Sequence, residues 1–157
     1  MSAFVIQLAA LAGGLNRLEE RALAADLELE ESQWPGTIFG ALTVERTGER
    51  VAVRGQVRAV AQLECGRCLV TFEQPVEGDL TLYADRSGGS LGLERELEDD
   101  HAMRFHDGRR LDLRGAAREA LLVELPITPR CREECRGLCP TCGADLNQGP
   151  CDCGGRE

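Results

Sequence analysis

The chain has 157 residues, of which 43% are hydrophobic and 29% are charged, a composition typical of a globular domain and not of a collagen, a coiled coil or a disordered chain. No segment has the roughly 18 consecutive uncharged apolar residues that a transmembrane helix requires. The net charge of −9 argues against a protein that coats RNA or DNA by bulk electrostatics, because such binding needs clustered cations.

The acidic excess is concentrated in two runs. Residues 19–31 contain six acids and one arginine, and residues 94–100 contain five acids and one arginine. Charge runs of this kind usually face solvent, so we interpret both as surface segments.

The N-terminal segment carries two different signals. The first dozen residues are apolar and predict a strand that ends at Gly13 and Gly14. Residues 15–31 are rich in Leu, Ala and Glu and are compatible with either a short helix or an extended acidic arm, before the break at Trp34-Pro35-Gly36.

Apolar residues alternate with polar ones between about residues 42 and 84. Residues 51–65 place their apolar side chains on odd positions, and residues 76–84 place theirs on even positions. A period of two is typical of strands with one buried face, so this region predicts an antiparallel meander. The sequence Cys65-Gly-Arg-Cys68-Leu lies between the two long strands, at a strand end.

The segment after the meander predicts a loop and then a helix. Residues 86–101 are first glycine-rich and then acidic, which predicts a mobile surface loop. Asp112 as N-cap, small and apolar residues at helical spacing, and the stop at Pro126 predict a helix over about 112–125. We expect His101 and His106 to be surface histidines, since no cysteine or serine motif lies near them.

These elements predict an α+β fold, mainly an antiparallel β-sheet meander with one principal helix and a C-terminal cysteine-rich, zinc-ribbon-like tail. We expect residues 1–129 to form the α+β domain and residues 130–157 to form the zinc-binding tail. The tail holds six of the eight cysteines and little aliphatic material, so apolar burial alone cannot fold it.

The cysteines predict metal binding. The apolar N-terminus has no basic segment before it, so we expect a cytoplasmic protein whose thiols stay reduced. Two short-range cysteine pairs in the tail then predict one four-thiolate Zn²⁺ site. Its ligands are Cys139, Cys142, Cys151 and Cys153.

The remaining cysteines leave alternatives open. A second four-thiolate site could join the meander to the base of the tail through Cys65, Cys68, Cys131 and Cys135. Cys135 could instead join the tail site, and Cys65 with Cys68 could be a reduced or redox-active pair. Closed four-cysteine sites leave no position for water or substrate, so we expect this zinc to be structural.

The motifs together are specific enough to resemble a known family. They are Glu64-Cys65-Gly-Arg67-Cys68-Leu69, the helix from Asp112-Leu113 to Leu125-Pro126, and a tail that reads Cys131-x3-Cys135-Arg-Gly-Leu-Cys139-Pro-x-Cys142-Gly-x-x-Leu146-Asn147 before Cys151-x-Cys153. From about residue 40 onward, this pattern resembles the YceD family, the large ribosomal RNA subunit accumulation proteins of bacteria and chloroplasts.

The resemblance implies a cytoplasmic factor for 23S ribosomal RNA accumulation and large-subunit biogenesis. It also implies a candidate partner, the small large-subunit ribosomal protein commonly encoded beside members of the family. Two mechanisms are open: acidic faces could hold a basic ribosomal protein, or a local arginine surface could contact precursor 23S rRNA. The candidate arginines are Arg104, Arg109, Arg110, Arg114 and Arg118, with Arg130, Arg132 and Arg136.

A function of another class is also compatible with the sequence. The chain could be a small zinc-binding or thiol-redox protein unrelated to ribosomes, which would predict labile metal and reversible thiol oxidation. The sequence contains no phosphate-binding glycine loop, nucleophile elbow or carboxylate pair in a recognisable frame. We therefore expect no enzymatic activity, no small-molecule substrate and no membrane association.

Overall fold

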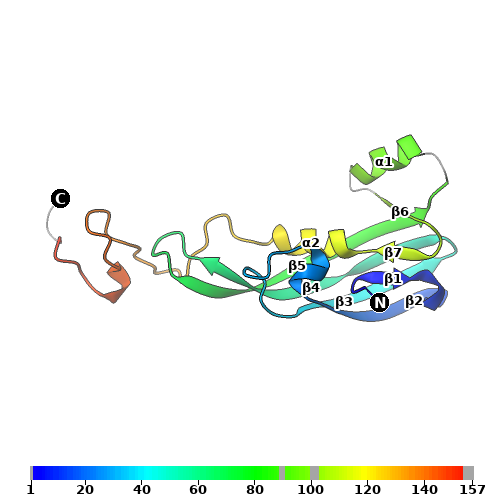
Figure 1. The fold of residues 1–157 in the computed structure, drawn as a ribbon. Coiled ribbons are helices and arrows are strands. Elements are labelled where there is room, and N and C mark those ends of the chain that lie inside the picture. Colours follow the sequence, from blue (N-terminus) through cyan, green and yellow to red (C-terminus); the bar gives the residue numbers. More distant parts are fainter. Residues whose placement is uncertain (1, 89–90, 100–102, 154–157) are drawn as a thin grey trace.

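The computed structural model describes residues 2–88, 91–99 and 103–153, and Figure 1 shows them as a sheet with a thin tail extending beyond one end. The strands are β1 (Val5–Gln7), β2 (Gly14–Ala22), β3 (Ile38–Thr47), β4 (Arg50–Glu64), β5 (Thr71–Arg86), β6 (Arg104–His106) and β7 (Arg110–Asp112). The helices are α1 (Leu91–Asp99) and α2 (Arg114–Leu122), and the 3₁₀ turns are η1 (Leu8–Ala10), η2 (Ala24–Leu27) and η3 (Leu146–Gln148).

The predicted predominance of β-structure is confirmed. Five strands form one sheet in the order β2-β3-β4-β5-β6, and β1 pairs with β7 in a separate two-stranded sheet. Neighbours from β2 to β5 are antiparallel, whereas β6 runs parallel to β5, so the large sheet is mixed.

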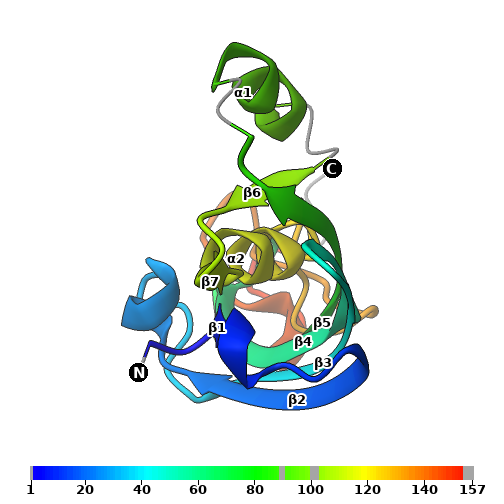
Figure 2. The ribbon, with the colours of Figure 1, turned by 90° about the vertical axis from the view of Figure 1, so that its right-hand side faces the viewer.

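Strands β4 and β5 form a long hairpin within the five-stranded sheet. Val51 pairs with Ala84 at one end and Glu64 with Thr71 at the other. Alternate side chains of β4, among them Val53, Val57 and Ala61, are fully buried. This period-two burial turns one face of the sheet towards the core, and Figure 2 shows that face curving around α2.

Helix α2 lies close against β5 because Gly78 has no side chain. A Cβ at Gly78 would overlap the carbonyl oxygen of Ala120 in α2. The buried α2 residues Ala117, Ala120 and Leu121 face the sheet there. The contact is thus backbone against backbone, and it fixes where the chain leaves the helix towards the tail.

Expectations for four individual segments differ from the structure. Residues 86–101 are not simply a loop: β5 runs to Arg86 and residues 91–99 form α1, a second helix. The Glu94 carboxylate holds α1 to the end of β5 by accepting hydrogen bonds from Ser87 Oγ at 2.8 Å and the Gly88 N–H at 2.6 Å. Sequence periodicity does not reveal such a polar anchor.

The acidic segment 15–31 combines the two alternatives: its first part is extended, as the edge strand β2 paired with β3. Residues 24–27 then form η2, where the Asp26 carboxylate accepts the Leu23 N–H at 2.8 Å. The N-terminal dozen is a strand only over Val5–Gln7, and η1 follows it directly.

The helix predicted over 112–125 is shorter, at Arg114–Leu122. Asp112 closes β7, and its carboxylate still accepts the Arg114 N–H at 2.9 Å. The residue directly before the helix is Leu113, which has no side-chain oxygen and is fully buried. Asp112 pairs with Val5 in the β1–β7 ladder and the Leu113 N–H donates to the Phe4 carbonyl at 2.7 Å, so the helix begins only after Leu113.

Candidate metal centres

The turn between β4 and β5 directs two thiols into the molecule. Around it, the Cys65 N–H donates to the Val70 carbonyl at 2.8 Å, and the Leu69 N–H donates to the Cys65 carbonyl at 3.0 Å. The Arg67 N–H points at Cys65 Sγ at 3.5 Å, and Leu69 takes a left-handed conformation with φ 64°. This tight turn leaves Cys65 and Cys68 buried side by side at the end of the sheet.

The base of the tail brings two more thiols to this turn. The Gly66 N–H donates to the Pro129 carbonyl at 2.7 Å, and the Arg67 guanidinium donates to the Cys135 carbonyl at 2.9 Å. Cys65 Sγ then lies 3.7 Å from Cys135 Sγ, and Cys68 Sγ lies 3.7 Å from Cys131 Sγ. The structure thereby groups Cys135 with the β4–β5 turn and not with the other tail cysteines.

All four sulfurs of this first cluster lie within 4.8 Å of one another. A disulfide would need a separation of roughly 2.0 Å, and all eight cysteines are free thiols. Four thiolates around a tetrahedral ion with Zn–S bonds of about 2.3 Å would be about 3.8 Å apart, close to the 3.7 Å seen here. The cluster could therefore bind one metal ion.

The second cluster lies wholly within the tail. The Gly143 N–H donates to the Cys139 carbonyl at 2.8 Å, and Gly143 has φ 75°, a conformation that glycine adopts without strain. This turn gathers four sulfurs within 4.8 Å of one another and could also bind a metal ion. Its members are Cys139, Cys142, Cys151 and Cys153.

The two clusters differ in burial. Three of the four cysteines are buried in the first cluster, whereas Cys139 alone is buried in the second and Cys142 is exposed. An ion in the first cluster would be enclosed between sheet and tail, and an ion in the second would lie near the surface. In both clusters the protein supplies all four ligands, so a tetrahedral ion would have no open position for a reactant.

In each cluster one cysteine of the CxxC turn is acidified. Hydrogen bonding from the Cys68 backbone lowers the pKa of Cys65 to about 6, and hydrogen bonding from the Cys142 backbone lowers the pKa of Cys139 to about 6. Burial raises the pKa of Cys131 to about 12. Each cluster therefore offers at least one thiol that ionises readily near neutral pH, and a cation must displace the protons of the thiols whose pKa is raised.

Asn147 is a site residue that reasoning from cysteine spacing misses. Its side-chain Nδ2 donates to Cys135 Sγ at 3.3 Å, although it belongs to the loop of the second cluster. This hydrogen bond is the main cause of a lowered pKa for Cys135. The signal available in the sequence is its place in the Leu146-Asn147 motif after the second CxxC turn.

The five candidate arginines between residues 104 and 118 do not form one free cationic surface. The Arg104 guanidinium donates to the Glu98 carbonyl at 3.0 Å, and the Arg114 guanidinium pairs with the Asp112 carboxylate at 2.7 Å. The other three make no ion pair within the part of the chain that the structure describes. They are the exposed residues Arg109, Arg110 and Arg118.

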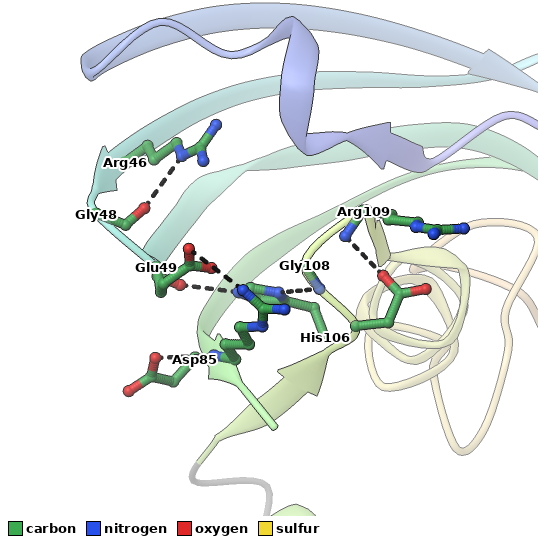
Figure 3. Close-up of polar contacts among 9 residues, drawn as sticks. Arg46, Gly48, Glu49, Asp85, His106, Gly108 and Arg109 are labelled. Carbon is green, nitrogen blue, oxygen red and sulfur yellow. Dashed lines mark hydrogen bonds and ion pairs between the residues drawn. The ribbon is translucent and has the colours of Figure 1, made fainter. Parts of the chain in front are cut away.

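His106 is buried, with 4% of its surface exposed, so the expectation of a surface histidine is wrong. Figure 3 shows its ring between the β3–β4 turn and the loop after β6. Nδ1 accepts the Gly108 N–H at 3.0 Å and Nε2 lies 2.8 Å from the Glu49 carbonyl oxygen, to which it donates. Both ring nitrogens are engaged, so His106 ties β6 to the sheet and offers no metal ligand. His101 lies outside the described residues.

Among the described residues, no helix is long and apolar enough to cross a membrane.

Comparison with known proteins identifies related sequences. The family model described as "Large ribosomal RNA subunit accumulation protein YceD" matches residues 53–157, which include both cysteine clusters. An uncharacterized protein of Mycobacterium leprae is 36% identical over 76% of this chain and 54% of its own length. An uncharacterized protein of Mycobacterium tuberculosis is 37% identical over 69% of this chain and 51% of its own length.

A maize protein named large ribosomal RNA subunit accumulation protein YCED homolog 1, chloroplastic, is 28% identical over 86% of this chain and 57% of its own length. The chain thus spans about half the length of the curated relatives it matches. No solved structure matches it.

Proposed function

The chain belongs to the YceD family of large ribosomal RNA subunit accumulation proteins, and from this premise we propose that it is a non-enzymatic factor for 23S rRNA accumulation and large ribosomal subunit biogenesis in the cytoplasm. The observation that carries the proposal is the family match over residues 53–157, which spans every cysteine of the two clusters. The geometry supports a structural role for any bound metal, because each cluster supplies all four ligands of a tetrahedral ion.

The metal in both clusters is zinc in this proposal. A ligand set made only of four cysteine sulfurs favours Zn²⁺. This ion is borderline-soft, binds thiolates well and has no geometric preference from its d-electrons. Zinc supplies no reaction here: it fixes the β4–β5 turn to the tail through the first cluster and closes the tail loop through the second. The chain's own part is to present four thiols at the right spacing and to keep water away from Cys65 and Cys135, which are at most 1% exposed.

The burial of the first cluster also bears on the thiol-redox alternative. Redox-active cysteines are accessible and low in pKa, whereas the low-pKa thiol Cys65 is fully buried. This supports a structural role over a redox role for the CxxC turn between β4 and β5.

The partner we propose is a basic large-subunit ribosomal protein. The net charge is −9, and each four-thiolate zinc site adds about −2 because four thiolates meet one divalent ion. The exposed acids Glu28, Glu30 and Glu31 lie on the segment after η2, and η2 packs against α2. The hydrogen bond and charge of Asp112, with a smaller contribution from Glu28, raise the pKa of Arg114, so this candidate RNA contact is already paired with an acid within the chain.

Depletion of the protein tests the function. We expect a selective fall in the 23S to 16S rRNA ratio with accumulation of 23S precursors, restored by the intact gene. An unchanged ratio would contradict the proposal and favour the zinc or thiol alternative.

Two matched charge variants distinguish the partners. We expect E28Q/E30Q/E31Q to fail in restoring the ratio and to lose crosslinks to a basic ribosomal protein, because the complementary charge is removed. R109Q/R110Q/R118Q removes three cations instead and should restore it. The reverse result, with crosslinks to precursor 23S rRNA lost in the arginine variant, would assign RNA as the partner.

A further inference from the structure

The loop between the two ligand pairs of the second cluster folds back on the linker between the clusters. The Leu146 N–H donates to the Gly137 carbonyl at 2.9 Å, and the Cys139 N–H donates to the Ala144 carbonyl at 2.8 Å. Leu138 and Asp145 form a β-bridge between the same two segments. Closure of the second cluster therefore positions residues 144–147 against residues 136–139, directly beside Cys135.

Asn147 uses this position to contact the first cluster. Its backbone N–H donates to Asp145 Oδ1 at 2.9 Å, which holds the residue in η3. Its side-chain oxygen accepts the Arg136 N–H at 2.9 Å. Because that oxygen faces a backbone donor, the amide nitrogen must face the other way, and it lies 3.3 Å from Cys135 Sγ.

We propose that Asn147 couples the two metal sites: the second site, when closed around its ion, presents the Asn147 amide to the Cys135 sulfur and thereby strengthens metal binding at the first. This inference rests on the metal sites of the proposed function and adds a positioning residue and an order of assembly to them. Hydrogen bonds to coordinated ligands orient them and stabilise their bound form, and losing one typically costs about 10- to 100-fold in metal affinity.

The coupling runs in both directions, because linkage between two binding sites is reciprocal. An ion in the first site fixes Cys135 and, next to it, the Arg136 N–H that Asn147 accepts. The contact joins residues 12 positions apart, so it forms only when the tail loop has closed. The first site joins the tail to the sheet. Closure of the second site strengthens this joint because it strengthens metal binding at the first site.

The neighbouring residue provides a matched control. Gln148 carries the same amide group in the same 3₁₀ turn, but its side chain is exposed and makes no hydrogen bond within the described residues. Gln148→Ala therefore removes a side-chain amide from the loop without touching Cys135. Asn147→Asp keeps an oxygen for Arg136 but puts a negatively charged oxygen in place of the donor to sulfur, so it removes the N–H···S contact and adds charge repulsion.

The test is a Co²⁺ titration of the full, reduced, metal-free chain, followed by the thiolate-to-cobalt charge-transfer absorption. We expect two ions per chain in the wild type and in Gln148→Ala. In Asn147→Ala and Asn147→Asp we expect about 10- to 100-fold weaker binding of one ion. The charge-transfer band of that ion should move to lower energy, because a thiolate without its hydrogen bond is a better electron donor.

A double-mutant cycle assigns the effect to coupling. Cys142→Ser with Cys153→Ser disables the second site, and we expect it to weaken Co²⁺ binding at the first about tenfold or more in the wild-type background. In the Asn147→Ala background the same change should have no further effect. Equal weakening in both backgrounds, or Asn147 variants that match Gln148→Ala, would overturn the coupling. Failure of the wild type to bind Co²⁺ would overturn the metal sites themselves.

Discussion

The sheet and the tail of this molecule are stabilised by different means. The sheet encloses an apolar core in which large side chains such as Phe4, Trp34 and Ile38 are at most 1% exposed. In the tail, beyond residue 130, the buried residues are mainly cysteines, among them Cys135 and Cys139. Apolar burial fixes the first region, whereas the second has little apolar material and gathers its cysteines into clusters that could bind metal ions. The first cluster belongs to both regions, so it is the joint between them.

Metal removal is expected to separate the two regions most strongly. With a chelator and a thiol reductant, residues 131–153 should lose their protection against amide hydrogen exchange, because their few backbone hydrogen bonds depend on the closed clusters. Strands β3, β4 and β5 should keep theirs. Hydrogen exchange read by mass spectrometry checks this, and simultaneous loss of protection in both regions would contradict it.

Acid should produce the same separation in a graded way. An ion needs all four thiols deprotonated, and the pKa of Cys131 is about 12 and that of Cys153 about 11, so binding releases protons at neutral pH. Metal affinity should therefore fall as the pH falls, by more than tenfold per pH unit, and it should fall more steeply below about pH 6, where Cys65 and Cys139 also protonate. Cobalt absorbance measured against pH checks this, and a flat profile between pH 5 and 8 would contradict it.

Gly78→Ala should weaken the sheet and leave the metal content unchanged. The new Cβ would overlap the Ala120 carbonyl and push α2 off β5, at a cost of about 1–3 kcal/mol in the free energy of unfolding. Gly115→Ala is the control, because a Cβ there meets nothing and should stabilise α2 by about 0.5 kcal/mol. Chemical denaturation with metal analysis checks both, and equal stabilities for the two variants would disprove the close contact.

Asp112→Ala should have the smallest effect. It removes the hydrogen bond to the Arg114 N–H and an ion pair that is about half exposed, which together contribute about 0.5–1 kcal/mol. The hydrogen bond from the Arg114 side chain lowers the pKa of Asp112 in the folded state. The contribution is therefore present above the carboxyl's ordinary pKa and is lost as the pH falls through the lowered value. Thermal melting of the wild type and Asp112→Ala at neutral and acidic pH checks this. A difference in melting temperature that grows in acid would contradict it.

The sequence predicts the long strands of the sheet better than it predicts the short elements and the tail. Alternating residues such as Val51, Val53 and Val57 indicate the strands because burial on one face imposes a period of two. No hydrophobic period predicts the parallel pairing of β6 with β5, which His106 supports by a hydrogen bond to Glu49, far away in the sequence. No period predicts helix α1 either, which Glu94 holds in place by a hydrogen bond from Gly88 in the short loop before it. The zinc ribbon expected for the tail stays a prediction.

Cysteine spacing predicts candidate ligands and stops short of their grouping. Cys135 lies four residues from both Cys131 and Cys139, so spacing alone assigns it to neither cluster. The hydrogen bond from Arg67 to the Cys135 carbonyl places Cys135 in the first cluster. This bond links residues 68 positions apart, so spacing does not reveal it. Asn147 is not predicted as a site residue either, because a side-chain amide that donates a hydrogen bond to a sulfur leaves no periodic pattern in the sequence. The domain boundary at about residue 130 also stays a prediction.

We propose that two zinc ions organise the tail: one joins it to the sheet through the first cluster, and the other closes its loop through the second. Native mass spectrometry of the chain, purified without added metal or chelator, tests it most directly when the same sample is measured again in denaturing acid. The account predicts a native mass that includes two zinc ions with the thiols deprotonated, and an acid-denatured mass of the fully reduced chain. A native mass without metal, or one reduced by disulfide formation, would contradict it.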